Sequence, residues 1–255
     1  MSQQVIQDGS APRDLQLRIF PVLDLMGGLV VHGRGGRRDE YRPIESALCS
    51  SPEPQAVATA FRERFGLDHL YVADLDAIAG APASTATFRL LKESGFELLV
   101  DAGARSADEA RRLLDAGVAG VIAPLETLPG PAALHDTLAA VGAARLIFSL
   151  DLKDGVPIGE LEPWGVTDPA ALAHRAIECG VERILVLDLS RVGSAEGPAH
   201  LKLLAGLRRD CPKLEILSGG GVRSHADLAS LEAAGVNGAL VATALHDGSL
   251  NLDGR

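Results

Sequence analysis

The sequence predicts an α/β fold, a single (β/α)8 barrel built from two (β/α)4 half-barrels. Eight short apolar runs alternate with amphipathic stretches along the 255-residue chain, a pattern that indicates parallel strands covered by helices. The runs are apolar on both faces, as expected for parallel strands that helices cover. Eight such units in about 250 residues fit a closed barrel better than an open sheet, and the two halves of the chain also resemble each other.

The expected elements alternate along the chain after a polar start. Residues 1–17 are expected to form an N-terminal tail, 18–250 the barrel and 251–255 a C-terminal tail. β-Branched and leucine-rich runs predict the strands, and the amphipathic stretches between them predict the helices. The predicted strands are 18–24, 69–74, 97–101, 119–123, 145–151, 182–188, 214–218 and 237–242. The predicted helices are 53–65, 84–95, 106–116, 130–141, 168–179, 199–210 and 224–234.

The stretch after the last predicted strand holds only "ALHDGSLNLDGR". It is long enough for one small helix but not for the usual eighth outer helix. We therefore expect residues 1–17 or a second copy of the chain to cover the groove left there.

Composition limits the kinds of partner. The chain carries a net charge of −10 and only 4% aromatic residues, which argues against nucleic acid or an anionic membrane as partner. No apolar run reaches the roughly 18 residues of a membrane helix, and the polar start lacks a signal core, so a cytoplasmic protein is expected. The three cysteines, Cys49, Cys179 and Cys211, are expected to be reduced thiols.

Three segments of the first half recur in the second. They are "FPVLDLMGG" and "IFSLDLKDG", "HLYVADL" and "RILVLDL", and "VDAGARSADEARRLLDAGV" and "SGGGVRSHADLASLEAAGV". This repetition indicates two half-barrels related by a pseudo-twofold axis, and it aligns Asp24 with Asp151 and Asp74 with Asp188. Asp24 and Asp151 are therefore expected to face each other across the mouth of the barrel.

Asp24 and Asp151 are the candidate catalytic residues. Each ends a predicted strand, and active sites of this fold lie at the carboxyl ends of the strands. Two carboxyl groups on opposite sides of one substrate suit general acid–base catalysis, because one takes a proton while the other gives one. The alternative is that each caps the turn that follows it. Asp74 and Asp188, which end two further strands, are expected to be at least partly structural.

A glycine-rich turn after the seventh strand predicts a phosphate site. Glycines let backbone N–H groups approach an oxyanion, and the following helix start adds a favourable dipole. Barrels commonly bind phosphate between strands seven and eight, where "VATAL" supplies further N–H groups. The predicted phosphate-binding residues are Gly219, Gly220, Gly221, Ala242 and Thr243. The glycines at 27–28 and 33–36 lack this context and are expected in a flexible loop.

The equivalent site in the first half is altered. Asp101 stands where the second half has Gly219, and an acid repels a phosphate dianion. Pro124 stands in place of Thr243 and has no backbone N–H to donate. The sequence thus predicts one phosphate site rather than two. Asp101 is expected to hold an amine or a hydroxyl group, or alternatively to pair with Arg105 or another arginine.

Six motifs between residues 18 and 250 resemble a known family. They are "FPVLDLMGGLVV", "LYVADLDAIAGAP", "SLDLKDG", "CGVERILVLDLSRVGSAEGP", "ILSGGGVRS" and "ALVATALHDG", and together they resemble the histidine-biosynthetic barrel family of the HisA isomerase and the HisF cyclase. HisA opens an aminated ribose phosphate by an Amadori-type rearrangement, and HisF closes an imidazole ring with ammonia from a glutaminase partner. The resemblance implies a barrel, a substrate with two phosphates, acid–base catalysis by Asp24 and Asp151, and no cofactor or metal.

Several positions depart from the family pattern and indicate a divergent subgroup. Leu187 stands where HisA carries a polar residue, Val192-Gly193-Ser194 replaces "DGT", and His32 stands in place of a HisF lysine. Trp164 matches the stacking aromatic of HisA only loosely. Arginines in the loop after His32 are expected to reach an anionic group or to face solvent; they are Arg34, Arg37 and Arg38. The further candidates for substrate contact are His32, Asp101, Asp188, Arg191 and Ser194.

Three functions remain open at this point. A HisA-like isomerase acting on a phosphorylated aminosugar or sugar phosphate is favoured. A HisF-like cyclase or lyase with an ammonia-supplying partner is the first alternative, and a catalytically altered protein that binds a phosphorylated ligand is the second. The remaining histidines show no metal-ligand spacing.

Overall fold

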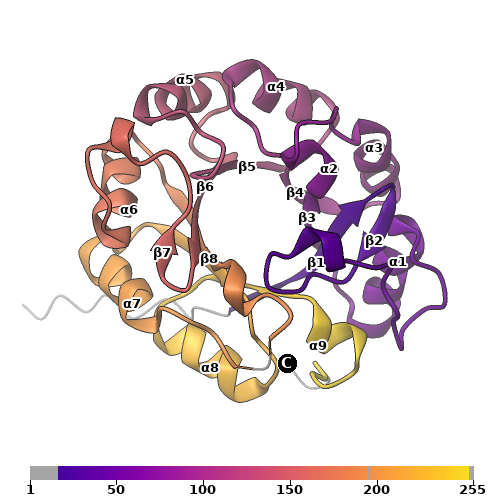
Figure 1. The fold of residues 1–255 in the computed structure, drawn as a ribbon. Coiled ribbons are helices and arrows are strands. Elements are labelled where there is room, and N and C mark those ends of the chain that lie inside the picture. The colour runs from indigo at the N-terminus through magenta and orange to yellow at the C-terminus, as the bar shows by residue number, and fades with distance from the viewer. Residues whose placement is uncertain (1–16, 195, 253–255) are drawn as a thin grey trace, which may run out of the picture.

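The structure is a computed structural model that describes residues 17–194 and 196–252, and it forms a closed barrel ringed by helices (Figure 1). Eight parallel strands follow one another around the barrel, and the last pairs with the first, with Leu240 opposite Phe20. The predicted TIM-barrel fold is therefore confirmed. The barrel strands are β1 (Arg18–Met26), β3 (His69–Asp74), β4 (Glu97–Asp101), β5 (Gly120–Pro124), β6 (Leu146–Lys153), β8 (Arg183–Asp188), β9 (Glu215–Gly219) and β10 (Gly238–Val241).

Strands β1 and β6 extend two residues beyond their predicted ends and turn back into short antiparallel partners. β2 (Leu29–Val31) pairs with β1, and β7 (Val156–Pro157) pairs with β6. The turns are Gly27-Gly28 and Asp154-Gly155, and all four residues have positive φ, as a two-residue hairpin turn requires. Gly27 and Gly28 thus form a defined turn and not the flexible loop expected for them.

The seven predicted helices are all present, with ends within two residues of those expected. Proline begins three of them, where its missing N–H costs nothing, and Ser side chains cap two others. None of the described helices is long and apolar enough to cross a membrane. The outer helices are α1 (Pro54–Phe65), α3 (Thr85–Glu93), α4 (Ala107–Asp115), α5 (Pro131–Val141), α6 (Pro169–Glu178), α7 (Leu201–Asp210) and α8 (His225–Ala233); single turns form α2 (Leu75–Ile78) and α9 (Thr243–His246).

The barrel interior is filled by one buried side chain from each of its eight strands. This layer closes the barrel below the strand ends, so a ligand can enter only from above. The layer consists of Phe20, Tyr71, Leu99, Ile122, Ile147, Leu185, Leu217 and Leu240. A second core lies between the sheet and the helices. Trp164 belongs to this outer core, 1% exposed and 5.4 Å from the Phe148 ring, so it is not the stacking aromatic of a ligand site.

The gap left by the missing eighth outer helix is partly filled from within the chain. The Ala47 N–H donates to the His246 carbonyl oxygen (2.8 Å), and His246 Nδ1 lies 3.0 Å from Ser46 Oγ. Leu250 is 1% exposed. The segment before α1 thus packs against the end of the chain, and the expected cover by residues 1–16 falls outside the described residues.

Candidate functional site

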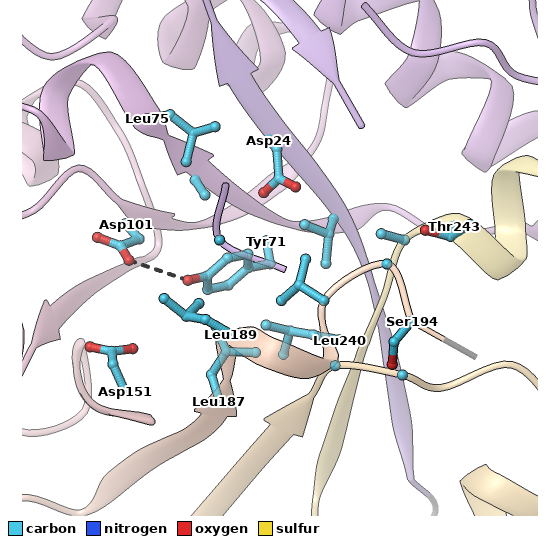
Figure 2. A pocket seen from close by; sticks show the side chains of 18 of the residues that line it. Asp24, Tyr71, Leu75, Asp101, Asp151, Leu187, Leu189, Ser194, Leu240 and Thr243 are labelled. Atoms are coloured by element: carbon cyan, nitrogen blue, oxygen red, sulfur yellow. Dashed lines mark hydrogen bonds between the residues drawn. The ribbon is translucent and has the colours of Figure 1, made fainter. Parts of the chain in front are cut away.

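A pocket opens at the carboxyl ends of the barrel strands (Figure 2). Its floor is apolar, and the polar groups stand at its two ends. In the view of Figure 2, Asp101 and Asp151 lie on the left of Tyr71, Ser194 and Thr243 lie on the right, and Asp24 lies above. Eight of the twelve residues predicted for the site line this pocket: Asp24, Asp101, Asp151, Ser194, Gly220, Gly221, Ala242 and Thr243. Gly219, His32, Asp188 and Arg191 do not line it.

Asp24 lies near the end of β1 and accepts no hydrogen bond from the described residues. The backbone of the next loop covers it, since a Cβ on Gly33 would lie 2.7 Å from Asp24 Oδ2. Burial raises the pKa of Asp24 to about 7, opposed by the charge of Arg38 and assisted by that of Asp101. A carboxyl group with this pKa exchanges protons near neutral pH.

Asp151 occupies the matching position on β6 and is more deeply buried, at 5% exposure. Its Oδ1 accepts a hydrogen bond from Ser149 Oγ at 2.6 Å. Its Oδ2 has no hydrogen-bond partner of normal geometry within the described chain, although the Glu126 backbone N–H lies close enough to the carboxyl group to lower the pKa of Asp151 slightly. Burial, together with the charge of Asp101, raises the pKa of Asp151 well above its usual range. Burial therefore favours the protonated form of the Asp151 carboxyl group, and that form can donate a proton.

Asp101 stands between these two acids at the end of β4. Its Oδ1 accepts the Gly103 N–H (2.9 Å), and its Oδ2 lies 3.4 Å from the Tyr71 hydroxyl, which donates to it. Burial raises the pKa of Asp101 to about 6. Arg105 donates to the carbonyl oxygens of Gly103 and Ile78 instead. The alternative of an Asp101–Arg105 ion pair is therefore wrong.

The glycine turn after β9 forms the opposite end of the pocket. Gly220 and Gly221 have φ values of 88° and 78°, a region that side-chain-bearing residues rarely enter. A Cβ at Gly221 would lie 2.4 Å from the Gly197 carbonyl oxygen, so the turn also needs glycine for space. The N–H groups of Gly220, Gly221 and Ala242 have no acceptor among residues 17–194 and 196–252. Free amides at a helix start suit an anion.

Comparison with known proteins agrees with this geometry. A family model described as "Histidine biosynthesis protein" matches residues 18–251. The chain belongs to this histidine-biosynthesis family. An uncharacterized protein of Methanocaldococcus jannaschii is 31% identical over 241 residues, covering 93% of this chain and 96% of the relative.

Two further relatives are named 1-(5-phosphoribosyl)-5-((5-phosphoribosylamino)methylideneamino)imidazole-4-carboxamide isomerase. That of Xanthomonas campestris pv. campestris is 30% identical over 247 residues, covering 93% of this chain and 98% of the relative. That of Xanthomonas oryzae pv. oryzae is 31% identical over 253 residues, covering 94% and 98%. The predicted family is therefore confirmed.

In this histidine-biosynthesis family member, the loop after β2 crosses the pocket mouth. The Gly35 N–H donates to the Val192 carbonyl oxygen at 2.9 Å, and a Cβ on Gly193 would lie 2.3 Å from the Gly33 carbonyl oxygen. The loop therefore packs on the segment after β8 and is not the free loop expected from its glycines. It brings Arg38 to the pocket, whereas Arg34 and Arg37 do not line it.

Three predicted contact residues of the family site lie just outside the pocket. His32 Nε2 lies 3.0 Å from Thr243 Oγ1 in a small adjoining cavity that Asp24 also lines, and burial lowers the pKa of His32. Arg191 forms an ion pair with Glu196. Gly219 ends β9 beneath the turn, with Leu240 against the place of its missing Cβ.

Asp188 supports backbone rather than lining the family pocket. It accepts the Gly155 N–H at 2.9 Å and lies 2.7 Å from His200 Nε2. Although burial raises it, hydrogen bonds from Ser190 and His200 bring the pKa of Asp188 to about 2. Its counterpart Asp74 likewise accepts a backbone N–H and caps α2.

Sequence reasoning missed four polar residues that line the pocket, Tyr41, Tyr71, Glu126 and Arg223. Arg223 follows the glycine turn directly and holds Asp247 at 3.0 Å, and its place in "GGGVRS" could have revealed it. Glu126, after β5, and Tyr71, in β3, carried no motif signal. Among the described residues, no group of three or more His, Cys, Asp or Glu side chains could hold a metal ion.

Proposed function

We propose that this protein is a HisA-like isomerase that converts a phosphorylated aminosugar or sugar phosphate from aldose to ketose. The observation that carries the proposal is the pairing of Asp24 and Asp151. They come from equivalent strands of the two half-barrels and line one pocket, and burial raises the pKa of both carboxyl groups. Raised pKa values suit carboxyl groups that exchange protons with a substrate near neutral pH.

Asp151 is the proposed acid because burial favours the protonated form of its carboxyl group. It donates a proton to the ring oxygen while the C1–O bond breaks, and the lone pair of the C1 nitrogen forms a protonated imine. Asp24, with a pKa of about 7, is the proposed base that removes the proton from C2. The electron pair of the C2–H bond forms an enaminol. Asp24 then returns its proton to C1, and the proton of the C2 hydroxyl passes to Asp151, which yields the aminoketose and restores both carboxyl groups.

The glycine turn after β9 is the proposed phosphate site. Gly220, Gly221, Ala242 and Thr243 offer backbone N–H groups, with Arg223 beside them, and Gly219 positions the turn from below. A fixed phosphate would hold the sugar so that its C1–C2 bond lies between the two acids. Ser194, His32 and Arg191 are proposed to shape the wall of this end, and Asp188 to hold the loop after β6.

Genetic complementation tests the proposed reaction. Expression in two histidine auxotrophs, one lacking the isomerase and one lacking the cyclase, should rescue growth only of the first. An Asp115→Asn variant, changed at an exposed position of α4, serves as a matched control and should rescue equally well. Rescue of the cyclase-deficient strain alone would overturn the isomerase in favour of the cyclase with its ammonia-supplying partner. Rescue of neither would favour a different phosphorylated substrate or a ligand-binding protein without turnover.

Assembly into a homo-oligomer stays a prediction. The segment before α1 already packs on α9, so a second copy would have to bind beside this contact. Sedimentation of the full-length protein at several concentrations would reveal it.

A further inference from the structure

We propose that the end of the pocket opposite the phosphate site binds a substrate ammonium group, so that the ligand is a monophosphate ester with an amine at its other end. The inference rests on the proposed function because it concerns the same pocket. It goes further by naming what replaces the second phosphate.

In the first half-barrel, the backbone N–H that corresponds to a proposed phosphate-binding N–H already donates a hydrogen bond within the protein. Gly103 and Gly221 are counterparts with similar left-handed backbone, at φ 63° and 78°. The Gly221 N–H has no acceptor in the described chain, whereas the Gly103 N–H donates to Asp101 Oδ1 at 2.9 Å. An aspartate side chain thus occupies the place that an anion would take.

The second set of donors is missing as well. Pro124 has no N–H, and the Leu125 N–H donates to the Ser149 carbonyl oxygen at 2.8 Å. The next residue, Glu126, lines the pocket with a further carboxylate. A phosphate at this end would meet the carboxylates of Asp101 and Glu126, while the Gly103 and Leu125 N–H groups already donate to other acceptors, which makes its binding unfavourable.

The same groups favour a cation. Asp101, Asp151 and Glu126 line one end of the pocket, and Asp151 is 95% buried from solvent with its Oδ2 unpartnered among the described residues. An ammonium group carries three N–H donors and a positive charge, so it can satisfy that oxygen and offset the neighbouring carboxylates. A hydroxyl group has one donor and no charge.

Arg38 provides only part of this charge, through an ion pair with Glu126 and a weak effect on the pKa of Asp101. Its guanidinium comes no nearer to Glu126 than 3.9 Å, its side chain is 36% exposed, and it makes no hydrogen bond to Asp101 or Asp151 among the described residues. The buried part of the acidic end therefore has no internal cation bonded to it.

Calorimetric titration of the full-length protein with three probe series tests the proposal. The series are ω-aminoalkyl phosphates, ω-hydroxyalkyl phosphates and α,ω-alkane bisphosphates, each with three to eight carbons so that the span need not be known. The best aminoalkyl phosphate should bind at least about 10-fold more tightly than its hydroxyl match, as a charge-assisted hydrogen bond supplies. The bisphosphate should bind least tightly.

Two variants assign the preference to the acidic end. Asp101→Asn keeps the side-chain shape and should reduce the amine preference to less than about 3-fold while affinity for the hydroxyalkyl phosphate is kept. Glu126→Gln, at an exposed position, should reduce the amine preference by a smaller factor. It tests the acidic end independently if Asp101→Asn does not fold. Asp115→Asn should change nothing.

The outcomes separate this proposal from the isomerase. Equal binding of amine and hydroxyl probes, or tighter binding of a bisphosphate, would overturn the ammonium site and leave the isomerase standing. An amine preference in a protein that rescues neither auxotroph would support the ammonium site while counting against the isomerase of histidine synthesis. If no probe bound, the phosphate site itself would be wrong, and the ammonium site with it.

Discussion

The two half-barrels share their backbone and differ in what they present to a ligand. Both end their first strand with an acid that lines the pocket, Asp24 and Asp151, and both turn that strand back through a two-residue hairpin. At the other strand ends, the second half offers free amides and the first half offers Asp101 and Glu126. The comparison teaches that the two half-barrels match at the proposed reacting acids and differ at the groups proposed to bind the two ends of a substrate.

The largest effect is expected from substitution of the two symmetry-related acids, Asp24 and Asp151. Asp24→Asn and Asp151→Asn preserve shape but remove proton transfer, so each should lower kcat/KM by roughly 100-fold or more. Growth rescue of the isomerase-deficient strain should fail for both, and Asp115→Asn should behave as the wild type. Circular dichroism should show both variants folded. Full activity in either variant would show that the two acids do not act as a pair.

The next comparison concerns the two equivalent glycines. A Cβ at Gly221 would lie 2.4 Å from the Gly197 carbonyl oxygen, and one at Gly103 would lie 2.9 Å from Ile78 Cα. Both alanine variants should lose stability, by about 1–3 kcal/mol. Only Gly221→Ala should also weaken binding of inorganic phosphate, by about 10-fold, because the Gly103 N–H is taken by Asp101. Thermal unfolding and calorimetry measure the two effects, and equal losses of phosphate affinity would restore a second phosphate site.

A smaller effect is expected at the second symmetric pair, where Asp188 has a structural role. Because its folded-state pKa of about 2 is below the ordinary value, ionised Asp188 stabilises the fold above about pH 4, and this contribution is lost as pH falls towards 2. Asp188→Asn should therefore cost about 2 kcal/mol at pH 7 and less at pH 3. Urea unfolding at both pH values measures this, and a loss that did not change with pH would contradict it.

The fold was predictable because it depends on local pattern. Strand and helix ends fell within two residues, and the only extended ends, at β1 and β6, follow from hairpins whose Asp154-Gly155 turn is a recognisable signal. The symmetric acids were also predictable, because the internal repeat aligned Asp24 with Asp151.

Other parts of the site depend on contacts between distant segments. Asp188 looked like a site residue at a strand end, but His200, twelve residues later, binds its carboxylate. Tyr71 lines the pocket because its strand, β3, pairs with β1, which carries Asp24. Trp164 has a plausible position in sequence, and only packing against Phe148 shows that it is buried elsewhere. A single sequence records none of these contacts directly.

The smallest expected effect compares two charges that act oppositely on the pKa of Asp24. One is Asp101, at the acidic end of the pocket, and the other is Arg38, in the loop that crosses the pocket mouth. Asp24 must be ionised to act as a base, so kcat/KM should fall as pH drops below about 7. The charge of Asp101 raises the pKa of Asp24 and that of Arg38 lowers it. Asp101→Asn should therefore move this limb of the profile to lower pH, and Arg38→Gln should move it to higher pH, each by less than about one pH unit.

The same shifts should appear in the ¹³C resonance of the labelled Asp24 carboxyl carbon, which needs no substrate. Shifts in the same direction for both variants would mean that conformational change rather than charge controls the proton on Asp24. Opposite shifts would show that the charges of Asp101 and Arg38 control the pKa of Asp24. Asp101, which stands where the second half-barrel has Gly219, would then also set the pH at which Asp24 works as a base.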